Sequence, residues 1–157
     1  MKNKDQLLSK QYNKYPYPRP VKNIDIEIIK KGKIPIADPN FSWHLLWPEL
    51  KYNNNNLNIL VAGCGTHQAA IIARLNPQNF ITGIDISNKS IIHEKNLKKL
   101  HNIKNLKLIN DDFRSVKFNE KFDYIISTGV IHHLKDPGTA LNFFQKNLKE
   151  EGVVYLM

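Results

Sequence analysis

The sequence of 157 residues predicts an α/β fold, in which a doubly wound and mostly parallel sheet of about five strands follows an N-terminal cap segment. From residue 57 onward, short apolar runs alternate with helix-compatible segments over short connections, as in successive βα units. The first of these runs ends in two glycines, Gly63 and Gly65, and an acidic residue, Asp85, closes the second. This order is typical of sheets that bind a nucleoside ligand at the carboxyl ends of their strands.

Residues 1–56 are predicted to form an N-terminal arm and cap segment, and residues 57–157 a separate domain. A run of asparagines marks the boundary as a polar linker at residues 51–56. Three prolines at alternate positions predict an extended path without helix for residues 11–20. The three tyrosines of the same stretch leave two interpretations open, an arm packed on the domain surface or a flap that adds aromatic walls to a ligand pocket.

Two short elements are predicted within the cap segment. Isoleucines at positions 24, 26 and 28 alternate with acidic residues, which is the periodicity of a strand. A short helix is expected at residues 40–50, with Asn40 or Ser42 as its N-cap. The large apolar side chains of this helix share one face, which we expect to pack on the main domain: Trp43, Leu46 and Trp47.

The domain that follows is predicted to alternate regularly between strands and helices. The expected strands cover residues 57–62, 80–85, 106–109, 122–127 and 153–157. The expected helices cover residues 67–75, 87–100 and 137–149, with a loop at 111–120 that contains at most a short helical turn. The last helix is expected to bury Leu141, Phe144 and Leu148 on one face. Because the sequence stops inside an apolar run, we expect either a central last strand in a minimal sheet or a C-terminally truncated chain.

Composition narrows the classes of function. The net charge of +9 comes from lysines spread along the whole chain, which favours a compositional bias over a nucleic-acid-binding surface. No apolar run approaches the roughly 20 residues that span a bilayer, and the N-terminus lacks the apolar core of a secretory signal, so we expect a cytoplasmic protein without a membrane segment. A single cysteine, Cys64, excludes a disulfide and a multi-cysteine zinc site, and we expect no metal.

Four groups of residues that could bind a ligand or take part in a reaction fall at the carboxyl ends of successive predicted strands. These ends meet at one edge of a parallel sheet. The glycine turn and the helix start after it expose backbone N–H groups to an anionic or polar ligand group. Asp85 stands where an acidic side chain binds ribose hydroxyls. A carboxylate at 111 or 112 can accept from an adenine amino group, and Phe113 can flank the ring. The fourth feature is residues 127–133, with two histidines.

With these motifs in place, residues 59–157 resemble a class I S-adenosylmethionine-dependent methyltransferase with a Rossmann-like fold. Residues 61–66 resemble the glycine-rich first motif of that family, and residues 83–87 its acidic ribose-binding motif. Residues 110–113 resemble its adenine motif, and residues 122–134 the fourth-strand motif of many small-molecule methyltransferases. Two departures stand in the first motif, where an acid is replaced by Val61 and the last glycine by His67.

The resemblance implies a set of cofactor contacts, with S-adenosylmethionine as the cofactor. The glycine turn is expected to hold its methionine part, Asp85 its ribose and Ile86 its adenine. Asp112, or alternatively Asp111, is expected to meet the adenine amino group. The implied cofactor-binding residues are Ala62, Gly63, Cys64, Gly65, His67, Asp85, Ile86, Asp111, Asp112, Phe113, Thr128 and Gly129. The family sheet usually continues with two further strands, so the resemblance also implies a truncated C-terminus.

The expected function is therefore methyl transfer from S-adenosylmethionine to a small-molecule acceptor. His132 and His133 are candidates for a general base, although one can equally pack in the loop while the other is solvated. Two alternatives remain: an NAD-dependent oxidoreductase, which would need a third glycine where Gln68 stands, and a non-enzymatic or degenerate cofactor-binding domain.

Overall fold

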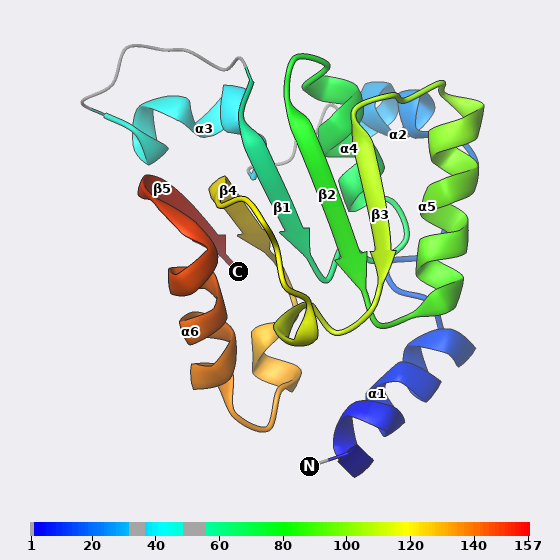
Figure 1. Cartoon of the computed structure of the whole chain (residues 1–157). Coiled ribbons are helices and arrows are strands. Elements are labelled where there is room, and N and C mark those ends of the chain that lie inside the picture. Colours follow the sequence, from blue (N-terminus) through cyan, green and yellow to red (C-terminus); the bar gives the residue numbers. More distant parts are fainter. Residues whose placement is uncertain (1, 32–36, 49–55) are drawn as a thin grey trace.

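The computed structural model describes residues 2–31, 37–48 and 56–157. Five parallel strands form a single sheet in the order β3-β2-β1-β4-β5, as Figure 1 shows. The doubly wound parallel sheet predicted from the sequence is confirmed. The strands are β1 (Asn58–Ala62), β2 (Phe80–Asp85), β3 (Leu106–Asn110), β4 (Phe122–Ser127) and β5 (Leu148–Leu156). The strand order reverses direction between β1 and β4, which is where sheets of this kind bind ligands.

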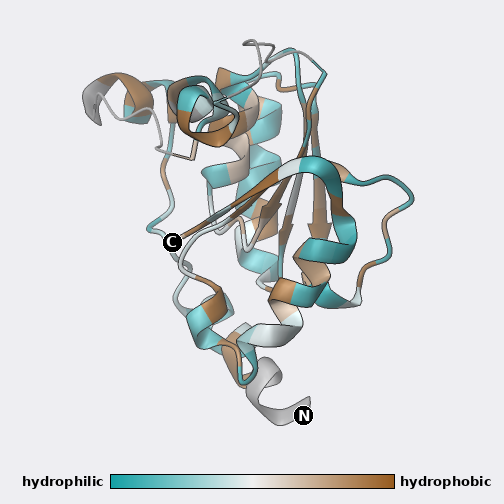
Figure 2. Ribbon diagram, turned by 90° about the vertical axis from the view of Figure 1, so that its left-hand side faces the viewer, coloured by the Kyte–Doolittle hydropathy of each residue, from teal (hydrophilic) through white to brown (hydrophobic). Residues whose placement is uncertain are grey.

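Helices cover both faces of the sheet. They are α1 (Lys2–Lys14), α2 (Ile24–Lys31), α3 (Pro39–Leu46), α4 (Gln68–Leu75), α5 (Asn88–Leu100) and α6 (Pro137–Asn147), with 3-10 turns η1 (Phe113–Ser115) and η2 (Ile131–His133). Successive residues of β1 point to opposite faces: Ile59 and Val61 join a core with residues of α2 to α5, and Leu60 joins a second core with residues of α6 and η1. Figure 2 shows the hydrophobic strands between the mixed surfaces of the helices.

The strand predicted around residues 24–28 is wrong, because these residues form helix α2. Ile24 and Ile28 lie one helical turn apart, and both pack into the first core, Ile24 fully buried. Ile26 points away, with 49% of its surface exposed. A five-residue run of alternating isoleucines fits a short strand and one face of a helix equally well, and packing against the domain decides between them.

The extended path predicted for residues 11–20 is also wrong in its first part. Helix α1 continues to Lys14, and the N–H of Tyr15 still donates to the carbonyl of Gln11 at 2.8 Å. Proline restricts its own residue and the one before it, so the first proline of the run, Pro16, ends the helix but leaves residues 11–14 free to be helical.

Helix α3 has the expected apolar face and a different cap. Trp43 and Trp47 are buried, while the N-cap is Asp38, whose carboxylate accepts from the N–H of Asn40 at 2.9 Å. In α6 Phe144 is buried as expected, but the expected burial of Leu141 is wrong: this side chain is 48% exposed, and Ala140 and Phe143 are buried instead. Leu148, expected on the same face, belongs to β5.

Residues 51–55 of the predicted linker lie outside the described residues. Within the part of the chain that the structure describes, no helix is both long enough and apolar enough to cross a membrane.

Gly83→Ala tests how tightly α4 packs on β2. A Cβ at Gly83 would lie 2.7 Å from the Cβ of Ala69, so α4 would have to move away from the sheet. We expect a loss of about 1–3 kcal/mol of unfolding free energy in urea titration, as for other overpacked cores. Replacing glycine by alanine in an uncrowded strand stabilises it, so a gain in stability would contradict this packing.

Candidate functional site

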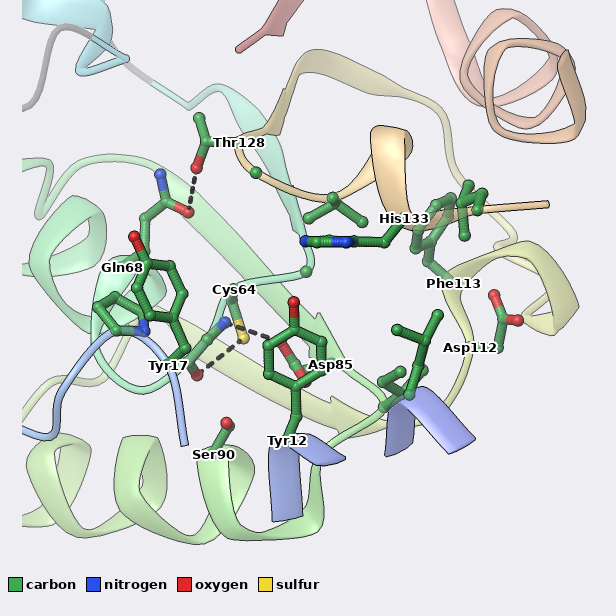
Figure 3. A pocket seen from close by; sticks show the side chains of 18 of the residues that line it. Tyr12, Tyr17, Cys64, Gln68, Asp85, Ser90, Asp112, Phe113, Thr128 and His133 are labelled. Carbon is green, nitrogen blue, oxygen red and sulfur yellow. Dashed lines mark hydrogen bonds between the residues drawn. The ribbon is translucent and has the colours of Figure 1, made fainter. Parts of the chain in front are cut away.

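A cavity of about 340 Å³ opens at the carboxyl ends of β1, β2 and β4. Its floor is the edge of the sheet, and α1 with the segment after it lies across its opening (Figures 1 and 3). This cavity is lined by all the residues that the resemblance implies as cofactor-binding, except Ala62. Ala62 is buried in the second core. The structure thus brings together residues that the sequence spreads from 63 to 129, and their binding roles stay a prediction.

Two chain segments pack against the glycine turn after β1, the N-terminal segment at Tyr17 and Pro18 and the segment after β4 at Val130. Gly63 and Gly65 both have positive φ, +76° and +60°. A Cβ at Gly65 would lie 2.7 Å from Cδ of Pro18 and 2.8 Å from the carbonyl oxygen of Tyr17, and one at Gly63 would overlap the side chain of Val130. The conformation of the turn favours glycine at both positions, and close packing against Tyr17 and Pro18 adds to this at Gly65, as does the Val130 side chain at Gly63.

Asp85 holds the turn from the side of β2. Its carboxylate accepts from the N–H of Gly65 at 2.8 Å and from the N–H of Ser87 at 2.8 Å. Burial raises the pKa of Asp85, while the two backbone hydrogen bonds act to lower it. The carboxylate oxygens still have lone pairs for further donors, so a pair of ribose hydroxyls can be accepted at the edge of the cavity.

The expectation that the start of α4 offers its N–H groups to a ligand is not met at Gln68, Ala69 and Ala70. The N–H of Gln68 donates to the carbonyl of Cys64, and those of Ala69 and Ala70 donate to the two carboxylate oxygens of Glu94 at 3.0 and 2.9 Å. A dinucleotide places its pyrophosphate at such a helix N-terminus, so this arrangement does not favour the NAD alternative.

Glu94 is the residue of this region that the sequence reasoning missed. It is fully buried on the inner face of α5, about one helical turn from the buried Ile91 and Leu97. A carboxylate aligned with the apolar face of a helix is the signal that could have revealed it, because charged side chains are buried only with partners.

The expected adenine end of the cavity contains two carboxylates with different partners. Asp112 caps η1 through the N–H of Arg114 at 3.0 Å and also accepts from Arg114 Nε at 2.9 Å. Asp111 accepts from the N–H of Asp112 at 2.7 Å. Phe113 is largely buried, and its ring stacks on that of Phe144 with a centroid distance of 5.5 Å. Asp112 is already paired with Arg114. Asp111 therefore remains the alternative acceptor for the adenine amino group.

The segment after β4 forms the opposite wall. Thr128 Oγ1 donates to Oε1 of Gln68 at 3.1 Å, and the N–H of Gly129 donates to the carbonyl of Met157 at 2.7 Å. Of the two candidate histidines, His133 lines the cavity, with its ring 6.0 Å from that of Tyr12, as Figure 3 illustrates. His132 packs its ring at 4.0 Å from His133 and is not part of the lining.

The N-terminal segment supplies the remaining wall, which favours the flap over the surface arm. Tyr12 and Tyr17 line the cavity. Thr66 Oγ1 donates to the carbonyl of Pro18 at 2.8 Å, and Ser9 Oγ donates to the carbonyl of Ile86 at 3.2 Å. The segment is thus fastened both to the glycine turn and to the residue that follows Asp85.

The sheet order, the glycine turn after β1 and the carboxylate after β2 define a Rossmann-like domain, whose cavity lies where sheets of this kind bind their ligands. The family model described as "Methyltransferase domain" matches residues 53–157. The chain belongs to this family.

Individual relatives agree with the family. An uncharacterized protein of Synechococcus sp. is 29% identical over 96% of this chain and 36% of its own length. A malonyl-[acyl-carrier protein] O-methyltransferase of Bacillus anthracis is 28% identical over 64% of this chain and 37% of its own length. The chain thus spans little more than a third of the length of these curated relatives.

Solved structures show the same fold. Magnesium protoporphyrin IX methyltransferase of Synechocystis PCC 6803, solved with bound S-adenosylmethionine, superposes with a TM-score of 0.67 at 16% identity, over 94% of this chain and 73% of that one. PKMT2 of Rickettsia typhi, solved with S-adenosylhomocysteine, gives 0.64 at 23% identity, over 71% of this chain and 22% of that one.

The stability of the protein is expected to fall as the pH rises from about 4.5 to about 8. Burial raises the pKa of Glu94 from 4.5 to about 8, so between these values the folded state keeps a proton that the unfolded state has released. Denaturant unfolding at a series of pH values should show this fall in the natural chain and a flatter profile in Glu94→Gln. Parallel profiles for the two proteins would rule out the raised pKa.

Proposed function

We propose that this protein binds S-adenosylmethionine in the cavity at the carboxyl ends of β1, β2 and β4 and transfers its methyl group to a small-molecule acceptor. The observation that carries the proposal is the Asp85 carboxylate, which is fixed by two backbone N–H groups at the edge of the cavity. Membership of the methyltransferase domain family supports the class of reaction. The proposed organisation is a cap segment at residues 1–56 and a cofactor-binding domain at 57–157.

The residues around the cavity fit this cofactor. A cavity of about 340 Å³ is within the range of small-ligand sites. Asp85 offers acceptors for the ribose hydroxyls, and Ile86 an apolar surface for the adenine. Asp111 or Asp112 would accept from the adenine amino group. The remaining proposed contacts are Gly63, Cys64, Gly65 and His67 at the methionine end, Phe113 at the adenine end, and Thr128 and Gly129 between them.

When bound, the cofactor supplies a methyl group that is already activated by the positive sulfur atom. The protein then has to align the acceptor and keep water away, which are effects of positioning more than of acid–base chemistry. Tyr12 and Tyr17 line the cavity, where their rings can shield a bound cofactor from water. His133 is the candidate base for an acceptor that must lose a proton, because it lines the cavity, whereas His132 does not.

Two proteins similar to this chain are named for different acceptors. One methylates malonyl-[acyl-carrier protein] and another magnesium protoporphyrin IX, so both a carrier-bound acid and a free macrocycle occur as acceptors among proteins similar to this chain. We therefore keep the proposed acceptor at the broader class of a small organic group.

Calorimetry with S-adenosylmethionine tests the proposal. We expect one saturable binding site in the natural chain, and a loss of about 1–3 kcal/mol of binding free energy in Asp85→Ala, because the ribose hydroxyls lose a charged acceptor. Asp123→Ala is the matched control: this carboxylate lies at the opposite end of β4, where it pairs with Lys149. Absence of binding heat with the folded natural chain would refute the proposed function, and equal affinity of Asp85→Ala and the natural chain would refute the role of Asp85.

A further inference from the structure

Glu94 is a fully buried carboxylate that neither the proposed cofactor contacts nor the proposed chemistry uses. It comes from the middle of α5 and reaches the first turn of α4, where each carboxylate oxygen accepts one backbone N–H. Its bonding partners, Ala69 and Ala70, are themselves fully buried. A side chain with these contacts acts as the N-terminal cap of a helix other than its own.

The first turn of α4 depends on this cap because the helix's own N-cap residue does not supply one. The residue at the N-cap position, His67, makes no side-chain capping hydrogen bond. On the sheet side, Ala69 sits against Gly83, where a Cβ would lie only 2.7 Å from its methyl group. The start of α4 is thus held between β2 on one side and Glu94 of α5 on the other.

The same turn of α4 is continuous with the glycine turn. The N–H of Gln68 donates to the carbonyl of Cys64 at 3.3 Å, and the N–H of Ile71 donates to the carbonyl of His67 at 3.0 Å. Cys64, His67 and Gln68 all line the cavity. A shift of the first helical turn therefore displaces the cavity wall, although Glu94 itself does not touch the cavity.

We propose that Glu94 is a positioning residue for the cofactor, which fixes the glycine-rich turn in its binding form by capping α4 from α5. This inference rests on the proposed function, since S-adenosylmethionine is the ligand whose affinity it concerns. Asp85 and Glu94 then have matching tasks: the first carboxylate anchors the turn at the N–H of Gly65, and the second anchors the helix that continues it.

The test compares Glu94→Ala with a control that loosens the opposite end of α4. The side-chain amide of Asn105 donates to the carbonyls of Ala73, Asn76 and Asn79, at the C-terminal end of the helix. Glu94→Ala removes two buried hydrogen bonds and Asn105→Ala three partly buried ones, so both variants are expected to lower the unfolding temperature. Only Glu94→Ala is expected to weaken S-adenosylmethionine binding, by about tenfold, the order of one lost buried hydrogen bond.

Glu94→Gln separates positioning from stability. Its side chain keeps the shape and one acceptor oxygen of Glu94, but its NH₂ group faces a backbone donor, so one of the two capping bonds is lost. Because the variant cannot ionise, its stability deficit relative to the natural chain is expected to shrink as the pH rises toward 8, whereas its affinity is expected to lie between those of the natural chain and Glu94→Ala. Should Glu94→Ala not fold, Glu94→Gln against Asn105→Ala gives the same comparison.

Three outcomes distinguish the inference from the function on which it rests. Affinity lost in the Glu94 variants and retained in Asn105→Ala supports the positioning role. Equal affinity in the natural chain and both Glu94 variants, or a loss in Asn105→Ala as large as in Glu94→Ala, overturns it while leaving the proposed function intact. A natural chain that does not bind S-adenosylmethionine overturns the function itself.

Discussion

The hydrogen bond from the N–H of Gly65 to the Asp85 carboxylate is the interaction on which the rest of the site depends. It joins the turn after β1 to the end of β2, so the two features that could bind the two ends of a nucleoside ligand are fixed relative to each other. The sheet makes this possible, because β2 pairs in parallel with the whole of β1 and the two strands end at the same edge. Burial of Asp85 strengthens the bond by lowering the local dielectric constant.

The same turn explains why the N-terminal segment belongs to the site. Gly65 leaves room for the backbone of Tyr17 and Pro18, and Thr66 donates a hydrogen bond to Pro18. A glycine at this position therefore serves the packing of residues far away in the sequence, besides admitting a ligand. The segment that covers the cavity and the turn that forms its floor are one packed unit, so binding of a cofactor inside it has to involve both.

Much of this arrangement could be predicted from the sequence, because the glycine turn and Asp85 carry strong local constraints at the ends of apolar strands. The strand predicted at residues 24–28 failed because five residues cannot distinguish a strand from one face of a helix. Glu94 was missed for a different reason: its partners, Ala69 and Ala70, lie 25 and 24 residues earlier, and only tertiary packing brings them together. Likewise, the spacing of the prolines could not show that Tyr12 lines the cavity, because the position of the N-terminal segment depends on tertiary packing against the domain.

We propose that the glycine turn, Asp85 and the segment after β4 form one cofactor site. Titration of the amide NMR spectrum with S-adenosylmethionine tests it most directly. We expect the largest shifts at Gly63, Gly65, Ile86 and Gly129, and we expect them to saturate together with one dissociation constant. Shifts confined to α2 and α3, which lie at the other end of the sheet (Figure 1), or no shifts at all at saturating concentrations, would contradict it.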